Sequence, residues 1–491
     1  MTEGAAWHFD NSLVRELGGF FAPHQAAPAK APRLVVFNDP LAAALNLPGR
    51  AAGEEALAGW LSGRDPVPGS EPVALAYAGH QFGQFNPQLG DGRALLLGEV
   101  IAPGGARFDL QFKGSGTTPY SRGGDGKCTL SAALREYLMS EAMAALGVPT
   151  TRSLAVVATG EGVWREEPHH GAVLTRVAAS HLRIGTFEWA AAHHGLDAVQ
   201  RLTGYALQRH YPALAGAANP ALALLEAVAD AQARLSAKWM ARGFVHGVMN
   251  TDNVTISGET IDYGPCAFLD AYSAGQVFSS IDRQGRYAFG QQPAVTRWNL
   301  YRLAGALIAA IAAVDEADTE QARLLLESWG ARYELYWLAE MRAKLGLFTD
   351  QADDLTLAHD LLTALEGQQA DFTLLFRALG RSLEQGYGAI ADELTDREAL
   401  ATWFQRWQAR LADEPQEGAD RAALMQAANP VYVPRNHLTD AALAAAEAGD
   451  MAPFMALLDA VSRPFDQRAG LDQFERGAAA GAAPFVTYCG T

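Results

Sequence analysis

The pattern of apolar and polar residues divides the chain into a strand-rich front part and a helical back part. Between about residues 76 and 175, apolar runs are short or alternate with polar residues, which is typical of strands. The predicted strands are 94–101, 107–113, 153–158 and 171–176. Residues 103–105 (Pro-Gly-Gly) predict a hairpin between the first two strands. Apolar side chains at three- and four-residue spacing over 129–146 predict one helix that packs on this small mixed sheet.

After about residue 185, the spacing of apolar residues is helical almost throughout. Helices are expected over 197–212, 219–242, 293–315, 317–345, 355–366, 397–412 and 438–461. The stretch 244–282 interrupts this pattern and holds most of the unusual polar residues, whereas residues 1–75 predict an irregular extension that packs on the rest of the chain. The predicted fold class is therefore α+β, with a small β-rich lobe, a large helical lobe and a cleft between them.

Composition and charge restrict the partners that we expect. The 491 residues are 49% hydrophobic and 19% charged, which predicts an ordinary globular chain with a substantial core. The formal net charge of −17 repels nucleic acids and anionic membranes, so neither is an expected partner. Any phosphate that such a chain binds must meet a local cluster of cations.

The same composition indicates where the protein works. The most apolar run, 303–314, is shorter than the roughly 20 residues that span a bilayer, so we expect a buried helix there. The N-terminal residues lack the basic and apolar pattern of a secretory signal. The three cysteines are too few for a disulfide framework, and the expected location is the reducing cytoplasm.

Two charged residues in the front part form the first candidate pair. Lys113 ends a predicted strand, and Glu136 lies on the predicted helix that follows. In protein kinases, a strand lysine paired with a helix glutamate holds the ATP phosphates. A solvated surface pair is the more ordinary interpretation of these two residues taken alone.

The interrupting stretch contains a second pattern of the kinase type. His246 and Asn253 have the spacing of the catalytic loop H-x-D-x-x-x-x-N, and Asp262 begins a D-x-G triplet further on. Asn and Asp oxygens suit Mg²⁺ that bridges phosphates, whereas the alternative is a loop in which they cap backbone groups. The position of the kinase catalytic aspartate is Val248, which cannot orient a hydroxyl, and Asp252 is the nearest carboxylate that can replace it. The pattern predicts a binding site for Mg-ATP with altered transfer chemistry.

Two glycine-rich turns flank Lys113. Residues 88–93 end in Arg93, and the loop 114–127 contains Arg122 and Lys127. Neither turn matches the kinase pattern G-x-G-x-x-G-x-V, and we reject the partial Walker A match at 121–128 because serine and cysteine replace two of its required residues. A single such turn is a plain hairpin by default. Together they allow close backbone approach to phosphate and supply the cations that the acidic chain otherwise lacks.

Long strings of the sequence resemble the selenoprotein O family of protein adenylyltransferases, in its cysteine-containing bacterial-type form. The strings are GHQFGQFN (79–86), QLGDGR (88–93), KGSGTTPYSR (113–122), HGVMNTDN (246–253) and NPVYVPRN (429–436). The resemblance implies a protein-kinase-like two-lobed fold. Its implied domains are an N-terminal extension packed on the N-lobe (1–75), a kinase-like N-lobe (76–180), a helical C-lobe (181–415) and a helical C-terminal extension with a redox-capable tail (416–491).

The resemblance also implies an activity. ATP would bind inverted relative to kinases, and AMP would pass to Ser, Thr or Tyr hydroxyls of proteins, including the enzyme itself, with Mg²⁺ and release of pyrophosphate. The implied ATP contacts are Gly90, Gly92, Arg93, Lys113, Asp125, Gly126, Arg176, Arg183 and Asp262. Glu136 would pair with Lys113, and Asp252 would be the catalytic base. Asn253 and Asp262 would hold the metal.

Three alternatives stay open at this point: a true phosphotransferase, UMP transfer with Mn²⁺, and a nucleotide-binding scaffold without catalysis. A monomer is expected. Cys489 stands where some family members carry selenocysteine, and we hypothesise a regulatory disulfide between Cys489 and Cys266, which follows the D-x-G triplet.

Overall fold

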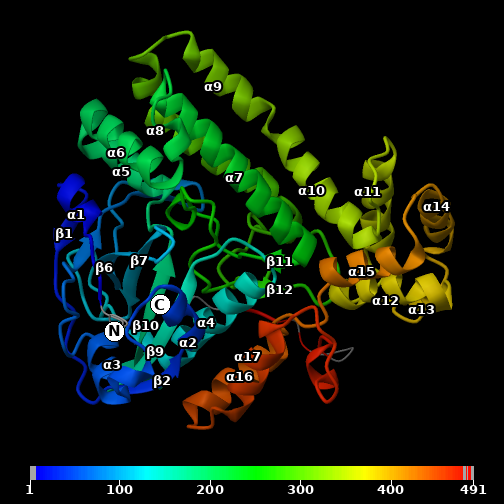
Figure 1. Ribbon diagram of the computed structural model, residues 1–491, viewed down its shortest axis with the longest axis horizontal. Helices are drawn as coiled ribbons and strands as arrows, with labels where there is room; N and C mark the ends of the chain where they lie inside the picture. Colours follow the sequence, from blue (N-terminus) through cyan, green and yellow to red (C-terminus); the bar gives the residue numbers. More distant parts are fainter. Residues whose placement is uncertain (1–6, 479–482, 484, 488–491) are drawn as a thin grey trace.

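The computed structural model describes residues 7–478, 483 and 485–487. The first part of the chain forms a β-sheet lobe, and a helical lobe follows it (Figure 1). Two helices near the C-terminus, α16 (Asn436–Glu447) and α17 (Ala452–Ser462), return to the sheet lobe and pack on α4 (Leu130–Ala145). The sheet lobe and the helical lobe confirm the coarse outline of the predicted α+β fold.

One antiparallel sheet is the framework of the first lobe. Its strands lie in the order β1-β3-β6-β7-β10-β9-β2, and the short β8 pairs with β10. In chain order these strands are β1 (Phe21–Pro23), β2 (Arg33–Phe37), β3 (Val73–Leu75), β6 (Ala94–Ile101), β7 (Arg107–Lys113), β8 (Cys128–Thr129), β9 (Arg152–Trp164) and β10 (Pro168–Ala178). Two small pairs lie outside the sheet, β4 (Gly79–Gln81) with β5 (Gln84–Asn86) and β11 (Phe244–Val245) with β12 (Ala267–Phe268).

The register of β7 and β10 brings three polar side chains to one face of the sheet. Lys113 pairs with Leu174, and Gln111 pairs with Arg176. Paired residues and residues two apart share a face, so Gln111, Lys113 and Arg176 point the same way. Asp262 meets them from the helical lobe, with its Oδ1 3.4 Å from the Lys113 ammonium.

The N-terminal segment is more regular than the sequence predicts. Residues 1–75 are expected to be irregular, yet they contain β1, β2 and β3, which complete both edges of the main sheet. They also contain α1 (Ser12–Glu16), α2 (Asp39–Ala44) and α3 (Glu54–Leu61). Strands of three to five residues are too short to show a period between proline and glycine turns. The sheet therefore includes strands from before residue 76.

The helical lobe contains the predicted helices up to residue 412, and two of the predicted helices of the chain are broken. Its helices are α5 (Ile184–His193), α6 (Gly195–His210), α7 (Pro220–Arg242), α8 (Gln292–Ala312), α9 (Asp318–Glu327), α10 (Trp329–Leu345), α11 (Asp354–Leu365), α12 (Phe372–Gln385), α13 (Gly388–Ala391), α14 (Ala401–Ala412) and α15 (Gly418–Ala428). Short 3₁₀ turns lie at Arg50–Ala52, Pro212–Leu214, Thr251–Asn253, Phe289–Gln291 and Asp472–Phe474. The predicted helix 317–345 breaks at Ser328. The predicted helix 438–461 breaks near Gly449, whose φ of 94° favours glycine.

Within the helical lobe, the helices α5, α12, α13 and α15 have no counterpart in the sequence prediction. For α12 the sequence did hold a start signal, because the Asp371 side chain accepts hydrogen bonds from the backbone N–H groups of Thr373 and Leu374. The signal is easy to miss when apolar periodicity is the main criterion.

The largest apolar core joins the two lobes. Leu75 and Leu96 of the sheet share one cluster with Ile184 of α5 and Leu303 of α8. The apolar run 303–314 lies mostly in α8, and its Leu303 and Ile311 are fully buried, which confirms the predicted buried helix. Within the described part of the chain, every helix is too short or too polar to cross a bilayer.

Glu259 carries one polar contact between the lobes. Its Oε2 accepts a hydrogen bond of 3.0 Å from the backbone N–H of Ala179, next to the end of β10, and one of 2.9 Å from the Ser257 hydroxyl. Burial raises the pKa of Glu259 to about 7, and these two hydrogen bonds lower it only in part. The side chain is thus a carboxylic acid in the folded protein under mildly acidic conditions.

The substitution Glu259→Gln should stabilise the protein at alkaline pH. Between about pH 4.5 and 7 the folded protein keeps the Glu259 proton and the unfolded chain loses it, so stability falls as pH rises through this window. At about pH 8 the variant should gain roughly 2–3 kcal/mol in free energy of unfolding, and at about pH 4 the gain should vanish. Urea denaturation across this range checks the prediction, and a gain that does not change with pH contradicts it.

Candidate active site

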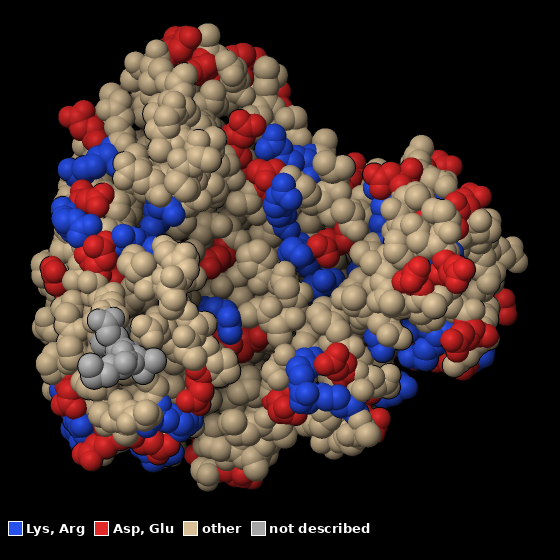
Figure 2. All heavy atoms as spheres, in the orientation of Figure 1, with Lys and Arg blue, Asp and Glu red and all other residues tan. Residues whose placement is uncertain are grey.

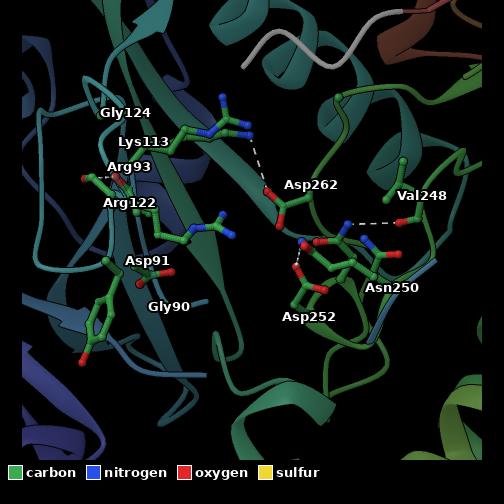
Figure 3. A pocket seen from close by; sticks show the side chains of 18 of the residues that line it. Gly90, Asp91, Arg93, Lys113, Arg122, Gly124, Val248, Asn250, Asp252 and Asp262 are labelled. Carbon is green, nitrogen blue, oxygen red and sulfur yellow. Dashed lines mark hydrogen bonds and ion pairs between the residues drawn. The ribbon is translucent and has the colours of Figure 1, made fainter. Parts of the chain in front are cut away.

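A pocket of about 510 Å³ opens between the main sheet and the loops that follow β11. Figure 3 shows Arg93 on the sheet side, with Val248 and Asp252 on the opposite side. The predicted residues that line it are Gly90, Gly92, Arg93, Lys113, Asp125, Gly126, Arg176, Arg183, Asp252, Asn253 and Asp262. Glu136 is the one predicted site residue that does not line the pocket, and its carboxylate accepts a hydrogen bond from the Lys113 ammonium. The volume is typical of a small-molecule or cofactor site.

Cations dominate the lining of this pocket. Four aspartates face seven basic residues, which are Arg93, Lys113, Arg122, Lys127, Arg165, Arg176 and Arg183. The whole chain carries a net charge of −17, and acidic and basic side chains are interspersed over the face shown in Figure 2. The local cluster of cations that phosphate binding requires in this acidic chain is therefore present, and it lies where the sequence predicts it.

Lys113 and Glu136 form a buried ion pair. The Lys113 Nζ lies 2.5 Å from the Glu136 Oε2, and the two residues are 6% and 3% exposed. Arg176 also donates to Glu136 and to Asp262. Burial alone would raise the pKa of Glu136, but the charges of Arg176 and Lys113 outweigh this and the pKa is lowered. The solvated surface pair is excluded, because all these charges lie inside the protein.

Asp262 is held by three cations. Besides Arg176 it meets Arg183, whose Nη1 lies 3.0 Å from its Oδ2, and the Lys113 ammonium at 3.4 Å. Burial would raise the pKa of Asp262, yet the three positive charges hold it well below the usual range. Its φ of 65° is a left-handed conformation that only a few non-glycine residues adopt. The surroundings thus fix Asp262 as a carboxylate at the pocket wall.

Asp252 lies in the 3₁₀ turn Thr251–Asn253, across the pocket from the glycine-rich turn. Its Oδ1 is buried and has no hydrogen-bond partner in the described structure, and its Oδ2 meets the Gln81 amide at 3.5 Å. Burial raises the pKa of Asp252 to about 6, and the charge of Arg183 opposes this shift. A carboxylate with an uncompensated oxygen and a pKa near neutrality is suited to accept a proton.

The residues present fit a divalent cation that is bound together with phosphate. The Asn253 amide nitrogen donates to the Val248 carbonyl at 3.0 Å, which leaves the amide oxygen as the ligand atom, and the Asp262 carboxylate lines the same pocket. Among the described residues, no group of three His, Cys, Asp or Glu side chains is arranged to hold a metal. Mg²⁺ at phosphate sites commonly takes one or two protein oxygens, with phosphate and water completing the shell.

The two glycine-rich turns pack against each other, as close backbone approach requires. A Cβ on Gly90 would stand 2.4 Å from the Tyr120 ring of the second turn, and the Thr118 hydroxyl donates to the Asp91 carbonyl at 2.6 Å. Within the second turn, a Cβ on Gly126 would stand 2.0 Å from the Gly116 carbonyl oxygen. Both glycines have positive φ angles, 73° and 66°. A side chain at either position would therefore push apart the walls that carry the predicted phosphate contacts.

Several lining residues escaped the sequence prediction, and Arg165, Asp91 and Tyr120 are three that contact predicted ones. Arg165 clamps the second glycine-rich loop, with its guanidinium 2.8 Å from the Asp125 carboxylate and 3.0 Å from the Lys127 carbonyl. Asp91 is fully buried and lies 3.9 Å from Arg183, while the Tyr120 ring covers Gly90. Asp91 had a weak signal, since it sits between two glycines, but Arg165 joins the site only through the β9–β10 pairing, which no local pattern predicts.

Comparison with known proteins agrees with this geometry. The family profile described as "Protein adenylyltransferase SelO" matches residues 5–462. This match covers most of the chain. The chain belongs to this family.

Relatives of this SelO-family chain align with it from end to end. It is 54% identical to the "Protein nucleotidyltransferase YdiU" of Sphingopyxis alaskensis, over 98% of the chain and 99% of the relative. It is likewise 54% identical to the protein of that name from Cereibacter sphaeroides strain KD131, over 99% and 100%. The Rhizobium rhizogenes protein is 49% identical over 98% and 97%. The SelO-family chain is thus a nucleotidyltransferase, and the family predicted from its sequence strings is confirmed.

The hypothesis of a regulatory disulfide between Cys266 and Cys489 in this SelO-family chain stays a prediction. Cys266 is fully buried, and its Sγ lies 3.4 Å from the Tyr263 carbonyl oxygen. Burial raises its pKa to about 11, so the thiolate that disulfide exchange needs is scarce in this conformation. Cys489 lies outside the described residues.

Arg165→Met should weaken nucleotide binding to the SelO-family chain without disturbing its fold. The substitution removes the clamp on Asp125 and Lys127, and we expect about tenfold weaker affinity for Mg-ATP. Isothermal titration calorimetry measures this, with Arg406→Met as the control because Arg406 pairs with Asp360 at the surface of α14. Equal affinity of the two variants would show that the glycine-rich loop keeps its shape unaided.

Proposed function

We propose that this protein transfers AMP from ATP to Ser, Thr or Tyr hydroxyls of proteins, including itself, and releases pyrophosphate. The proposal rests above all on the pocket lining, in which seven basic residues face four aspartates and the kinase position for a catalytic aspartate is the apolar Val248. We further propose a protein-kinase-like fold, a monomer in solution, and Mg²⁺ as the metal, with Mn²⁺ as the alternative.

The arrangement of cations favours an inverted nucleotide. Lys113, Arg176 and Arg183 are nearly fully buried beside Asp262, and they suit the charged end of a triphosphate. With the β- and γ-phosphates at this end, the α-phosphate would stand nearer the pocket mouth, where an acceptor protein reaches it. A kinase needs the opposite order, because its γ-phosphate meets the acceptor.

The chain's own groups provide the remaining chemistry. The acceptor hydroxyl oxygen forms a bond to the α-phosphorus, the bond from the α-phosphorus to the bridging oxygen breaks, and pyrophosphate leaves. Asp252 takes the hydroxyl proton. Its carboxylate is suited to this role because Oδ1 has no hydrogen-bond partner among the described residues and the pKa is raised to about 6. Lys113, Arg176 and Arg183 stabilise the charge on the departing pyrophosphate. A bound Mg²⁺, held by Asn253 and Asp262, would supply further neutralisation of phosphate charge.

Two rival functions fit the site less well. A phosphotransferase would lack its aspartate at Val248. A binding scaffold would have no use for the buried, unpartnered oxygen of Asp252, which is costly to bury.

Labelled ATP tests the proposal directly. With Mg²⁺, label from α-³²P-ATP should enter protein, and label from γ-³²P-ATP should not. Asp252→Asn keeps the size of the side chain but removes the base, so transfer should fall by about 10²- to 10⁴-fold while ATP still binds. Asp360→Asn, an exposed acid on α11, is the control. Label from the γ-position would support the phosphotransferase instead, and a parallel reaction with α-labelled UTP and Mn²⁺ tests UMP transfer.

Removal of divalent metal should abolish transfer and weaken nucleotide binding together. The pocket offers few protein ligands, so the metal enters with the phosphates and its loss affects both steps. Treatment with EDTA followed by titration of Mg²⁺ or Mn²⁺ measures the dependence, with α-label transfer and ATP binding as the two readouts. Full transfer in EDTA would contradict a metal-assisted reaction.

A further inference from the structure

Of the site contacts described so far, the hairpin β4–β5, residues 79–86, takes part only in the long one between Gln81 and Asp252. It lies apart from the main sheet and packs on the loop that carries Asp252. Two of its residues, Gln81 and Phe82, line the pocket, and Phe85 on the outer side is exposed. A hairpin of this size is not stable alone, so its position depends on what it touches.

Backbone N–H groups of the hairpin hold the loop residues on the N-terminal side of Asp252. The His80 N–H donates to the Thr251 hydroxyl at 2.7 Å, and the Phe82 N–H donates to the Asn250 Oδ1 at 3.0 Å. Next to them, the Gln81 amide meets the Asp252 carboxylate itself at 3.5 Å. Three consecutive hairpin residues thus contact three consecutive loop residues.

Glu188 of α5 joins the hairpin and the loop from the helical lobe. Its Oε1 lies 2.5 Å from the His80 Nδ1, and its Oε2 accepts a hydrogen bond of 2.6 Å from the Thr251 hydroxyl. Glu188 and Thr251 are buried. The Thr251 hydroxyl therefore uses both its acceptor and its donor capacity, and it is the joint at which hairpin, loop and helix meet.

Glycine allows the two walls to approach Asp252 this closely. A Cβ on Gly79 would stand 2.7 Å from the Asp252 Oδ1. On the other side, a Cβ on Gly185 would stand 2.2 Å from the Ala78 carbonyl oxygen and 3.5 Å from the Asp252 Cα. A larger residue at Gly79 would thus press on the Asp252 side chain, and one at Gly185 would press on Ala78 and lie against the Asp252 backbone.

The side chain of Asp252 is hardly restrained by bonds of its own. Its Oδ1 has no partner among the described residues, and its Oδ2 has only the long contact to Gln81. Its place is thus determined by the backbone on either side, that is, by Thr251 and by the Arg183 guanidinium, which donates to the Asp252 carbonyl at 2.6 Å. A misplacement of about 1 Å in a reacting group costs roughly 10²-fold in rate.

We propose that the 79–86 hairpin, through the His80–Thr251–Glu188 hydrogen bonds, is the device that positions Asp252 for transfer. This inference rests on the proposed function, because it assigns Asp252 a proton to accept. Thr251 and Glu188 act through Asp252 and touch no substrate, so they are positioning residues. The hairpin governs the acceptor end of the reaction and leaves the phosphate end to the cation cluster.

The decisive comparison is between Thr251→Val and Thr251→Ser. Valine keeps the shape and removes the hydroxyl, so kcat for transfer of the α-label should fall by about 10- to 100-fold, with KM for ATP within about twofold of wild type. Serine keeps the hydroxyl and should restore kcat to within about threefold. Thermal denaturation and calorimetric ATP binding are measured on every variant, to separate loss of position from loss of fold.

Gly79→Ala gives a second test that removes no hydrogen bond. Its added methyl group should displace Asp252 and lower kcat by about tenfold or more, again with nearly unchanged KM for ATP. Gly104→Ala is the matched control, because a Cβ there meets no atom within 4 Å. Wild-type kcat in both Thr251→Val and Gly79→Ala would overturn the inference, as would a rise in KM for ATP equal to the fall in kcat.

The same experiment separates the two proposals. If wild-type protein transfers no α-label to any acceptor, the proposed function is wrong. If wild-type protein transfers α-label and both Thr251→Val and Gly79→Ala do so equally well, only the role of the hairpin is wrong.

Discussion

The buried cluster of Lys113, Arg176, Arg183, Glu136 and Asp262 is the interaction on which the site depends. Burying an isolated charge costs several kcal/mol, so each member needs the others to stay ionised inside the protein. The cluster draws its members from β7, β10, α4, the segment before α5 and the loop after β11. Removing one member would leave its partner unpaired and loosen several elements at once. The same bonds therefore join the lobes and shape the pocket.

Basic residues also outnumber acidic ones across the whole pocket. The buried cluster itself is close to balanced, because three cations face Glu136 and Asp262 and the buried Asp91 carboxylate lies 3.9 Å from Arg183. The excess of positive charge comes from the other basic residues of the lining, and such a gathering of cations in one pocket is costly unless an anion completes it. A polyphosphate with its metal does so, and this is the physical reason that a nucleotide belongs in the pocket. Arg183 gains some support from the face of the Tyr77 ring, 4.7 Å away.

The sequence predicted the parts of the site that have local signatures. Lys113 ends a strand with clear alternation, Asn253 and Asp262 have a recognisable spacing, and glycines mark both turns. Arg165 and Glu188 had no such signature, because their roles come from strand pairing and helix packing between distant segments. In the fold, too, only elements with a local sequence pattern could be predicted. Long periodic helices were predicted, while β1 and β3 were missed because three-residue strands carry no period and exist only as edges of a sheet.

The two ends of the pocket are controlled by different kinds of interaction. At the phosphate end, strong ion pairs hold rigid arginine side chains that come from the sheet and its margin. At the other end, hydrogen bonds to the backbone and to Thr251, together with glycine contacts, hold the loop, and the Asp252 side chain is carried on it with little direct restraint. Ion pairs tolerate small displacements because Coulomb energy changes slowly with distance, whereas a proton acceptor must be placed within a few tenths of an ångström. Nucleotide binding and transfer should therefore be separable by substitution at the hairpin and at Thr251, since His80 and Thr251 lie outside the pocket lining, whereas Arg183 contacts both Asp262 and the Asp252 carbonyl.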